Sequence, residues 1–340
     1  MKKQTKQQAI LHQLRSLANQ PREQAHYALE VLERERGKQV ASEALAVLTN
    51  APVPQGRLLL RRLYEYYDDA GVKRDAGGDL RIAIVGALLL IAEPQDQALA
   101  ERAVSTYEFM PPNREECTSG LRTAGLVLLN NLDPVLASFH CTRLLVDEEY
   151  TSRMSGEPAV SAARLLTSQV SHLPYQGHLL PLYSYLFQSK CHPEVEGECL
   201  RLLAKALEGI VGSILSHYTT RISVGTGTPV PRHETKGDVV LLGLFDLLLA
   251  SSKESACLSF IEAFLHETQR YDIYHYVLTT IIANHSSEAW NLLLKVAQDE
   301  REPEKIQLLL SALTLVQHDP AIEKVIHELQ QKIAPEKSGS

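Results

Sequence analysis

Four prolines of this 340-residue chain are spaced 40 residues apart, and this period constrains the fold more than any other feature. They are Pro54, Pro94, Pro134 and Pro174. Each opens a stretch with helical spacing, and the residue five positions later is Leu59, Leu99, Phe139 or Leu179. A helical hairpin of about 40 residues cannot bury its apolar face alone, so such hairpins stack on one another. The period therefore predicts an array of packed helix pairs.

A second pattern recurs in the helix that precedes the proline. The segment GDLR, which ends at Arg81, is matched by SGLR, which ends at Arg122. Both continue through Ala, Leu and Val residues to an acid–proline step. At the second step, Asp133 is suited to cap a helix and Pro134 to occupy its first position. These steps predict helix starts.

The remaining organisation follows from periodicity and turn residues. About 16 helices are expected, among them 95–109, 113–131 and 194–218, and no sheet, because no segment shows sustained period-2 alternation. Residues 219–237 hold three glycines and two prolines, which predicts an irregular loop that protrudes from the helices. This loop would separate a regular half, 1–218, from a less regular half, 238–333, with a polar tail at 334–340.

Composition limits the classes of partner. The formal net charge is −7, whereas nucleic-acid binders usually carry a basic excess, so the charge disfavours DNA and RNA. Five cysteines and no apolar leader-like stretch at the N-terminus predict a reducing cytoplasm with free thiols. No run of 18 apolar residues is present, so no membrane span is expected.

An acidic residue precedes the recurring arginine by six positions in two units, as Asp75 before Arg81 and Glu116 before Arg122. This arrangement resembles HEAT repeats, the α-solenoid family of antiparallel helix pairs. The resemblance covers about residues 38–333 and implies an all-α, right-handed solenoid. Such folds host scaffolds, transport receptors, lyases and DNA-repair glycosylases, so the resemblance implies a fold rather than one function.

Looser copies of the arginine pattern occur at Arg164 and Arg201. There the acid is displaced, to Glu157 in one unit and to Glu194 or Glu196 in the other. All four arginines have two interpretations. The favoured one is a structural ladder, in which each arginine pairs with an acid of its own or the next repeat. The other is a row of cations that faces a ligand in a concave groove, so the four stay candidate binding residues.

Tyrosine is used more than phenylalanine, 13 against 6, and supplies further candidates. A tyrosine offers apolar area and a hydroxyl group, which suits a half-exposed binding surface as well as helix packing. Two pairs lie three residues apart on one helical face, Tyr64 with Tyr67 and Tyr271 with Tyr274. Packing is the favoured interpretation of these pairs. The predicted loop adds Arg221, Arg232 and His233 as candidate binding residues.

The sequence gives little support for a metal-binding, nucleotide-binding or catalytic site. Cys191, His192 and Cys199 resemble half of a zinc site, but the cysteines are eight residues apart and no second pair completes four ligands. The glycines of 225–228 lack the Lys-Ser/Thr that a phosphate-binding loop needs. We therefore predict no catalytic residue, metal or cofactor, and leave enzymatic activity open but disfavoured.

The leading hypothesis is a cytoplasmic protein-interaction scaffold or adaptor, which binds another protein along the concave face of the solenoid. One alternative is a nucleic-acid-binding or DNA-repair protein with a basic groove. Its candidate cations are Arg57, Arg61, Arg62, Lys73, Arg74 and Arg81, which nearby acids almost cancel. The other alternative is a solenoid lyase that acts on a small molecule in a polar pocket beside residues 219–237.

Overall fold

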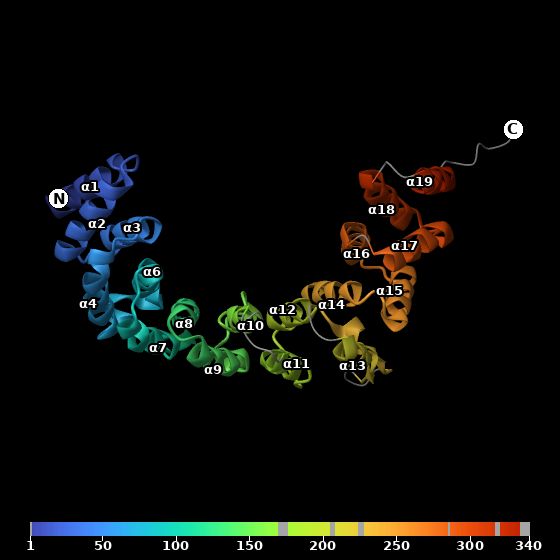
Figure 1. Cartoon of the computed structure of the whole chain (residues 1–340), viewed down its shortest axis with the longest axis horizontal. Coiled ribbons are helices and arrows are strands. Elements are labelled where there is room, and N and C mark those ends of the chain that lie inside the picture. The colour runs from blue at the N-terminus through green and yellow to red at the C-terminus, as the bar shows by residue number, and fades with distance from the viewer. Residues whose placement is uncertain are drawn as a thin grey trace. The chain divides into compact units, whose positions relative to one another are not determined.

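The computed structural model describes residues 2–168, 176–204, 208–223, 228–284, 286–316 and 320–333. These residues form nineteen α-helices, which pack in sequential pairs (Figure 1). Internal contacts divide the chain into two compact units, Met1–His178 and Leu179–Ser340. Each unit is therefore described by itself.

The first unit contains ten α-helices among its described residues. They are α1 (Lys2–Ser16), α2 (Pro21–Arg34), α3 (Lys38–Asn50), α4 (Arg57–Asp68), α5 (Gly71–Arg74), α6 (Asp79–Leu88), α7 (Gln97–Val104), α8 (Ser119–Leu132), α9 (Pro134–Leu145) and α10 (Ala159–Ser168). Short 3-10 turns lie at η1 (Pro54–Gly56), η2 (Ala76–Gly78), η3 (Pro94–Asp96), η4 (Glu148–Tyr150) and η6 (Gln176–Leu179).

Two layers of helices build this unit. In one layer α3, α6, α8 and α10 pack on one another in succession. The helices α2, α4, α7 and α9 cover this layer, with α2 on α3, α4 on α6, α7 on α8, and α9 on α8 and α10. On α4 the buried residues Leu59, Leu60 and Leu63 form one helical face, and each buried leucine contributes about 1.5–3 kcal/mol. Paired apolar faces thus make the core.

The second unit repeats this arrangement. Its helices are α11 (Leu180–Leu186), α12 (Pro193–Leu203), α13 (Glu208–Thr219), α14 (Asp238–Ala250), α15 (Ser255–Glu267), α16 (Tyr271–Asn284), α17 (Ser287–Asp299), α18 (Pro303–Leu313) and α19 (Pro320–Ile333), with 3-10 turns η7 (Arg232–Thr235) and η8 (Thr314–Val316). One layer runs through α12, α14, α16 and α18, and the other through α13, α15, α17 and α19.

The contact between α12 and α14 requires glycine. A Cβ atom on Gly197 would lie 2.6 Å from the carbonyl oxygen of Val239, and a Cβ atom on Gly243 would collide with the carbonyl oxygen of Gly197. A larger residue at either position would therefore force the two helix backbones apart.

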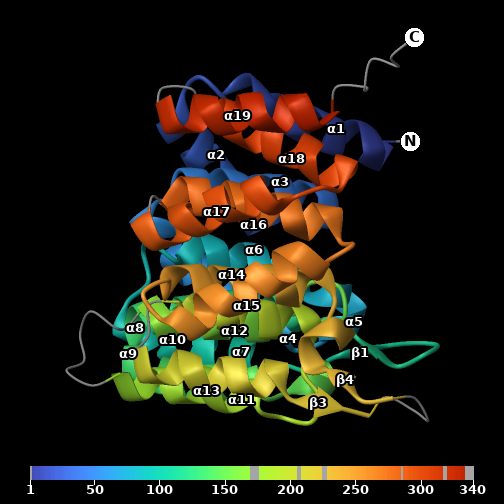
Figure 2. The same cartoon turned by 90° about the vertical axis from the view of Figure 1, so that its right-hand side faces the viewer.

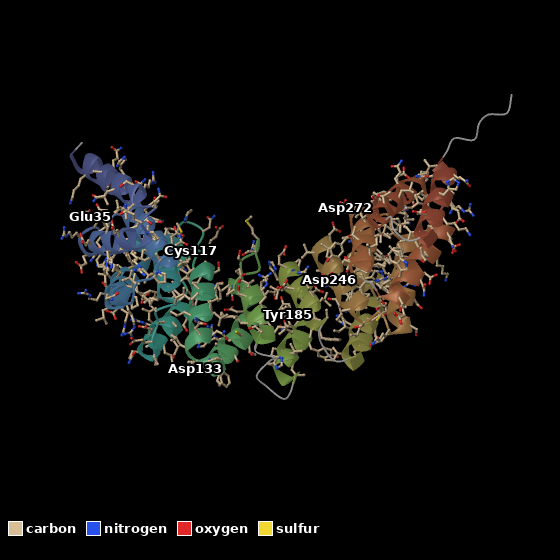
Figure 3. All side chains as sticks on the ribbon, turned by 45° about the horizontal axis from the view of Figure 1, so that its top comes forward. Glu35, Cys117, Asp133, Tyr185, Asp246 and Asp272 are labelled. Atoms are coloured by element: carbon tan, nitrogen blue, oxygen red, sulfur yellow. The ribbon has the colours of Figure 1, made fainter. Side chains whose placement is uncertain are left out.

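The acid–proline steps start helices as predicted. Asp133 caps α9, since its Oδ1 accepts a hydrogen bond of 3.0 Å from the backbone N–H of Leu136, and Pro134 is the first helical residue (Figure 3). At Glu93, the backbone N–H donates to Asp96 Oδ2 at 2.8 Å, within a capping box that opens η3. Pro174 lies outside the described residues.

Several expectations are wrong. The described residues form nineteen helices, not about 16. No sheet was expected, but the structure has two small antiparallel hairpins, one of β1 (Phe109–Met110) and β2 (Glu115–Glu116), the other of β3 (Arg221–Ile222) and β4 (Val230–Pro231). The expected helix 95–109 ends at Val104, because a hairpin follows it. The expected helix 194–218 is two helices, α12 and α13.

The segment predicted as an irregular loop is partly regular. Within 219–237, β3 (Arg221–Ile222) pairs with β4 (Val230–Pro231), and the turn η7 follows. Residues 224–227 and the predicted tail at 334–340 lie outside the described residues. The organisation into halves around 219–237, the solenoid shape and its handedness stay predictions.

Three of the five cysteines, Cys141, Cys199 and Cys257, are buried. Burial raises the pKa of Cys141 to about 12 and that of Cys257 to about 11, which keeps both as unreactive thiols near neutral pH. Among the described helices, none is both long and apolar enough to cross a membrane.

Replacement of the α9 cap tests the acid–proline step. Asp133→Ala removes the acceptor for the Leu136 N–H and should lower the free energy of unfolding by about 1 kcal/mol, measured by urea denaturation. Asp133→Asn keeps an acceptor oxygen and is the matched control. Equal losses in both variants would contradict a capping role.

Candidate functional site

A β-hairpin interrupts the helices between α7 and α8 and projects beyond them (Figure 2). Strand β1 (Phe109–Met110) pairs antiparallel with β2 (Glu115–Glu116), so that Phe109 lies opposite Glu116. Its tip carries Arg114, whose φ of 54° lies in the left-handed region that allows a tight reversal of the chain. A non-helical element is thus built into the first unit.

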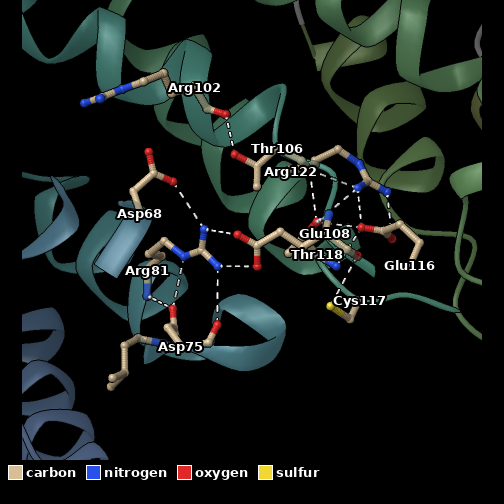
Figure 4. Close-up of polar contacts among 11 residues, drawn as sticks. Asp68, Asp75, Arg81, Arg102, Thr106, Glu108, Glu116, Cys117, Thr118 and Arg122 are labelled. Atoms are coloured by element: carbon tan, nitrogen blue, oxygen red, sulfur yellow. Dashed lines mark hydrogen bonds and ion pairs between the residues drawn. The ribbon is translucent and has the colours of Figure 1, made fainter. Parts of the chain in front are cut away.

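Arg81 holds the base of the first strand. Its side chain is fully buried, and its two terminal nitrogens donate to the two carboxylate oxygens of Glu108, each at 2.7 Å. Nε donates to Asp75 Oδ2 at 3.2 Å, and Nη1 donates to Asp68 Oδ1 at 3.2 Å (Figure 4). The carboxylate of Asp75 also accepts the backbone N–H of Arg81 at 3.0 Å, which caps α6. One arginine thus joins α4, α6 and the hairpin.

Arg122 holds the base of the second strand. It too is fully buried, and it donates to Glu116 through Nη1 at 2.6 Å and Nη2 at 3.1 Å. Nη1 donates to the carbonyl oxygen of Thr106 at 3.2 Å, and Nη2 donates to that of Tyr150 at 2.6 Å. The ring of Tyr107 covers the guanidinium group at 4.3 Å. The predicted six-residue spacings, from Asp75 to Arg81 and from Glu116 to Arg122, therefore both correspond to ion pairs.

Burial and partners set the charge state of this cluster. Burial alone would lower the pKa of Arg81, but its hydrogen bonds and charge attraction to Glu108 and Asp75 outweigh burial and raise the pKa above the usual range. Burial also raises the pKa of the Cys117 thiol, whose Sγ donates to the carbonyl oxygen of Glu108 at 3.3 Å (Figure 4). The base of the hairpin is therefore buried and held by ion pairs, and its cysteine thiol is unreactive.

A hollow of about 1240 Å³ lies beside the hairpin. One set of lining residues comes from the hairpin, between Tyr107 and Glu116, and is called the hairpin wall. Another comes from Glu149 to Arg153, around the turn η4, and is called the η4 wall. Val72 of α5 and Ser119 of α8 complete the lining.

Aromatic and apolar side chains line this hollow. Tyr150 packs edge-on against Tyr107, with ring centres 5.1 Å apart, and against Phe109, with ring centres 5.8 Å apart. Phe109 and Val72, which line the hollow, are 41% and 39% exposed. Met110 follows Phe109 in β1 and is also exposed, but it does not line the hollow. Met154, next to the η4 wall, is 91% exposed. Val72 and Phe109 thus give the lining exposed apolar area, which is typical of interaction surfaces.

Charges of both signs surround the apolar centre. The carboxylates of Glu108 and Glu116 are paired with the buried arginines. Glu115 and Glu149 are exposed, and the structure shows no ion pair for either within its described residues. Arg114 at the tip of the hairpin is likewise exposed. The hollow can therefore offer apolar contacts, together with carboxylates that accept hydrogen bonds and an arginine that donates them.

The other two recurring arginines differ from this pair. Arg164 on α10 is exposed. Arg201 pairs with Glu198 at 2.6 Å and with Asp246 at 2.9 Å, so the partners expected from the sequence, Glu194 or Glu196, are wrong. The ladder interpretation thus describes Arg81, Arg122 and Arg201, each of which pairs with an acid close to it in the chain and also contacts a later helix pair. Ligand binding by the four arginines stays a prediction.

The tyrosine pairs are mostly interior. Tyr64, Tyr67 and Tyr274 are buried, and burial raises the pKa of each hydroxyl. Tyr271 is half-buried and donates a hydrogen bond to Glu302; this bond, with burial, raises the pKa of Tyr271 to about 12. The packing interpretation therefore describes three of the four, and binding by them is a prediction that the structure leaves open.

Of the three candidates from the predicted loop, His233 contacts helices of the second unit. His233 Nδ1 lies 3.2 Å from the carbonyl oxygen of Tyr218, and its ring contacts Phe260. Arg221 is exposed, and its Nε donates to the carbonyl oxygen of Pro229 at 3.1 Å; Arg232 is half-buried.

A buried ionic contact holds this second hairpin. Glu196 accepts hydrogen bonds from Tyr218 at 2.5 Å and from Lys236 at 2.8 Å. Lys236 follows η7 directly, so the contact ties the end of the hairpin segment to α12 and α13. The segment predicted to protrude as a loop is therefore anchored at its C-terminal end.

Most cations proposed for a basic groove are paired with carboxylates. Arg57 lies 2.6 Å from Glu93, and Arg61 lies 3.4 Å from Asp96. The other two paired cations are Arg74, at 3.2 Å from Asp69, and the buried Arg81. Arg62 and Lys73 are exposed.

The described part of the chain brings together no group of three His, Cys, Asp or Glu side chains that could hold a metal ion. The lining of the hollow, as the structure describes it, contains no histidine, cysteine or lysine. Comparison with protein-family models, curated proteins and solved structures gave no match. The class established is an all-helical protein of sequentially packed helix pairs that carries short hairpins.

Sequence reasoning missed the hollow. The sequence analysis places Tyr107 and Phe109 in an expected helix, 95–109, and no local pattern singles out Tyr150. The signal that could have found the hairpin is the run Pro111-Pro112-Asn113, since these residues favour a turn and end a helix before them.

The buried cluster predicts a large cost for removal of Arg81. Arg81→Met leaves Asp75 and Glu108 without their cation and should lower the free energy of unfolding by about 3–5 kcal/mol, measured by urea denaturation. Arg15→Met is the matched control, because Arg15 forms an exposed pair with Glu43 and its loss should change little. A similar small effect in both variants would contradict the structural role of Arg81.

Proposed function

We propose that this chain is a protein-interaction scaffold of the helical-repeat type, and that its first unit binds a segment of a partner protein in the hollow beside the β1–β2 hairpin. The observation that carries the proposal is the exposed apolar lining of the hollow, Val72 and Phe109, with the exposed Met110 and Met154 next to lining residues in the chain. Apolar patches with aromatic side chains and a polar rim are typical of protein interfaces.

Contacts between residues about one period apart support the repeat character. Lys38 contacts Asp79 across 41 residues, and Tyr107 donates to Asp147 across 40 residues. In the second unit, Lys305 donates to the carbonyl oxygen of His266 across 39 residues. Packing of consecutive, similar helix pairs would produce such spacings, as the resemblance to HEAT repeats implies.

The size and chemistry of the hollow favour a protein segment over a small molecule. Its volume exceeds the range of about 300–1,000 Å³ typical of small-molecule sites. It lies in the first unit, not beside residues 219–237, where a lyase pocket was expected. Four of the six cations proposed for a nucleic-acid groove are paired with carboxylates, so no specific observation favours that alternative.

Substitution of one exposed aromatic residue tests the proposal. The wild-type protein should capture a stoichiometric partner protein from its native host. With that partner purified, Phe109→Ser should weaken binding about tenfold or more, since an aromatic anchor contributes over 1 kcal/mol. Calorimetry or fluorescence anisotropy gives the dissociation constant.

Phe139→Ser is the matched control for this experiment. Phe139 on α9 is 70% exposed but does not line the hollow, so its replacement should leave binding intact. An equal loss in both variants would place the interface elsewhere. Failure to capture any protein, together with tight and strongly salt-dependent binding of a nucleic acid, would overturn the proposed function.

A further inference from the structure

We infer that Arg122 is a positioning residue that sets the separation of the hairpin wall and the η4 wall, an inference that rests on the proposed binding function of the hollow. Arg122 lies on α8 and does not line the hollow. Its guanidinium group is nevertheless bonded to both walls. The width available to a bound segment would therefore depend on a side chain that the segment never contacts.

The contacts divide between the two walls. On the hairpin wall, both terminal nitrogens of Arg122 donate to Glu116. Nη1 also donates to the carbonyl oxygen of Thr106, which directly precedes this wall in the chain. On the η4 wall, Nη2 donates to the carbonyl oxygen of Tyr150 at 2.6 Å. The same nitrogen, Nη2, therefore bonds to both walls at once.

A second link between these segments also depends on Arg122. The hydroxyl of Tyr107 donates to Asp147, which precedes η4, at 2.6 Å. The ring of Tyr107 rests on the guanidinium group of Arg122 at 4.3 Å. Loss of the guanidinium plane would therefore remove the support beneath this link as well.

Arginine is required here because of its shape. Its planar group presents donors in a rigid fork, whereas lysine presents one compact charge at the end of a flexible chain. In Arg122→Lys, a single nitrogen could hold Glu116 but could not keep all the contacts to Thr106 and Tyr150. By contrast, Arg81 contacts the hairpin but has no contact with the η4 wall in the described structure, so it cannot set the separation alone.

Dipolar EPR on the unliganded protein measures this separation. Nitroxide labels are attached at Asn113→Cys, on the hairpin tip, and at Met154→Cys, beside the η4 wall, with the half-buried Cys117 and Cys191 replaced by serine.

We expect a narrow distance distribution for the doubly labelled parent and a broader one with a longer mean in Arg122→Lys. Glu116→Gln weakens the hairpin contacts alone and should also broaden it. Arg57→Lys, an equal change at an inter-helix ion pair away from the hollow, should not.

The outcomes separate this inference from the proposed function. Unchanged distributions in Arg122→Lys and Glu116→Gln, with helical circular dichroism retained, would overturn the positioning role and leave the binding proposal standing. If Arg122→Lys does not fold, Glu116→Gln decides by the same criterion. A changed distance between the two walls, together with weaker partner binding, supports both the positioning role of Arg122 and the proposed binding function. A changed separation in a protein that captures no partner supports the positioning role and removes the proposed function.

Discussion

Two buried guanidinium groups organise the first unit. Arg81 and Arg122 have no exposed surface, so each needs carboxylates and carbonyl oxygens to replace water. Each finds one acid six residues earlier and further partners in the next segment of chain. A local ion pair at the start of a helix is thereby extended into a contact between successive helix pairs.

The same contacts explain how a helical framework carries a non-helical site. A hairpin with two-residue strands is unstable by itself. Here Glu108 and Glu116, at its two strands, are held by Arg81 and Arg122, so the tip and the aromatic side chains project from a rigid base. Binding residues on loops that a rigid scaffold positions are common in proteins. The binding proposed for the hollow would be a further case of this arrangement.

The predictable features were those with a local cause. The 40-residue period anticipated packed helix pairs, Asp133 anticipated a cap, and the six-residue spacing anticipated two ion pairs. The pairing of Arg81 with Glu108 spans 27 residues, so no local pattern contains it. Nor does the period predict exposure, since Leu59 and Leu99 are buried whereas Phe139, at the equivalent place, faces solvent. Hairpin and hollow arise from such non-local contacts.

Hydrogen exchange across residues 106–118 tests most directly whether the hairpin is a rigid, arginine-anchored wall. The backbone N–H of Cys117 donates to Glu108 and that of Thr118 to the Glu116 carboxylate, so these amides should exchange slowly, close to the rate of α8. The exposed tip, at Asn113 and Arg114, should exchange rapidly. Uniformly rapid exchange through the whole segment, with α8 still protected, would contradict the account.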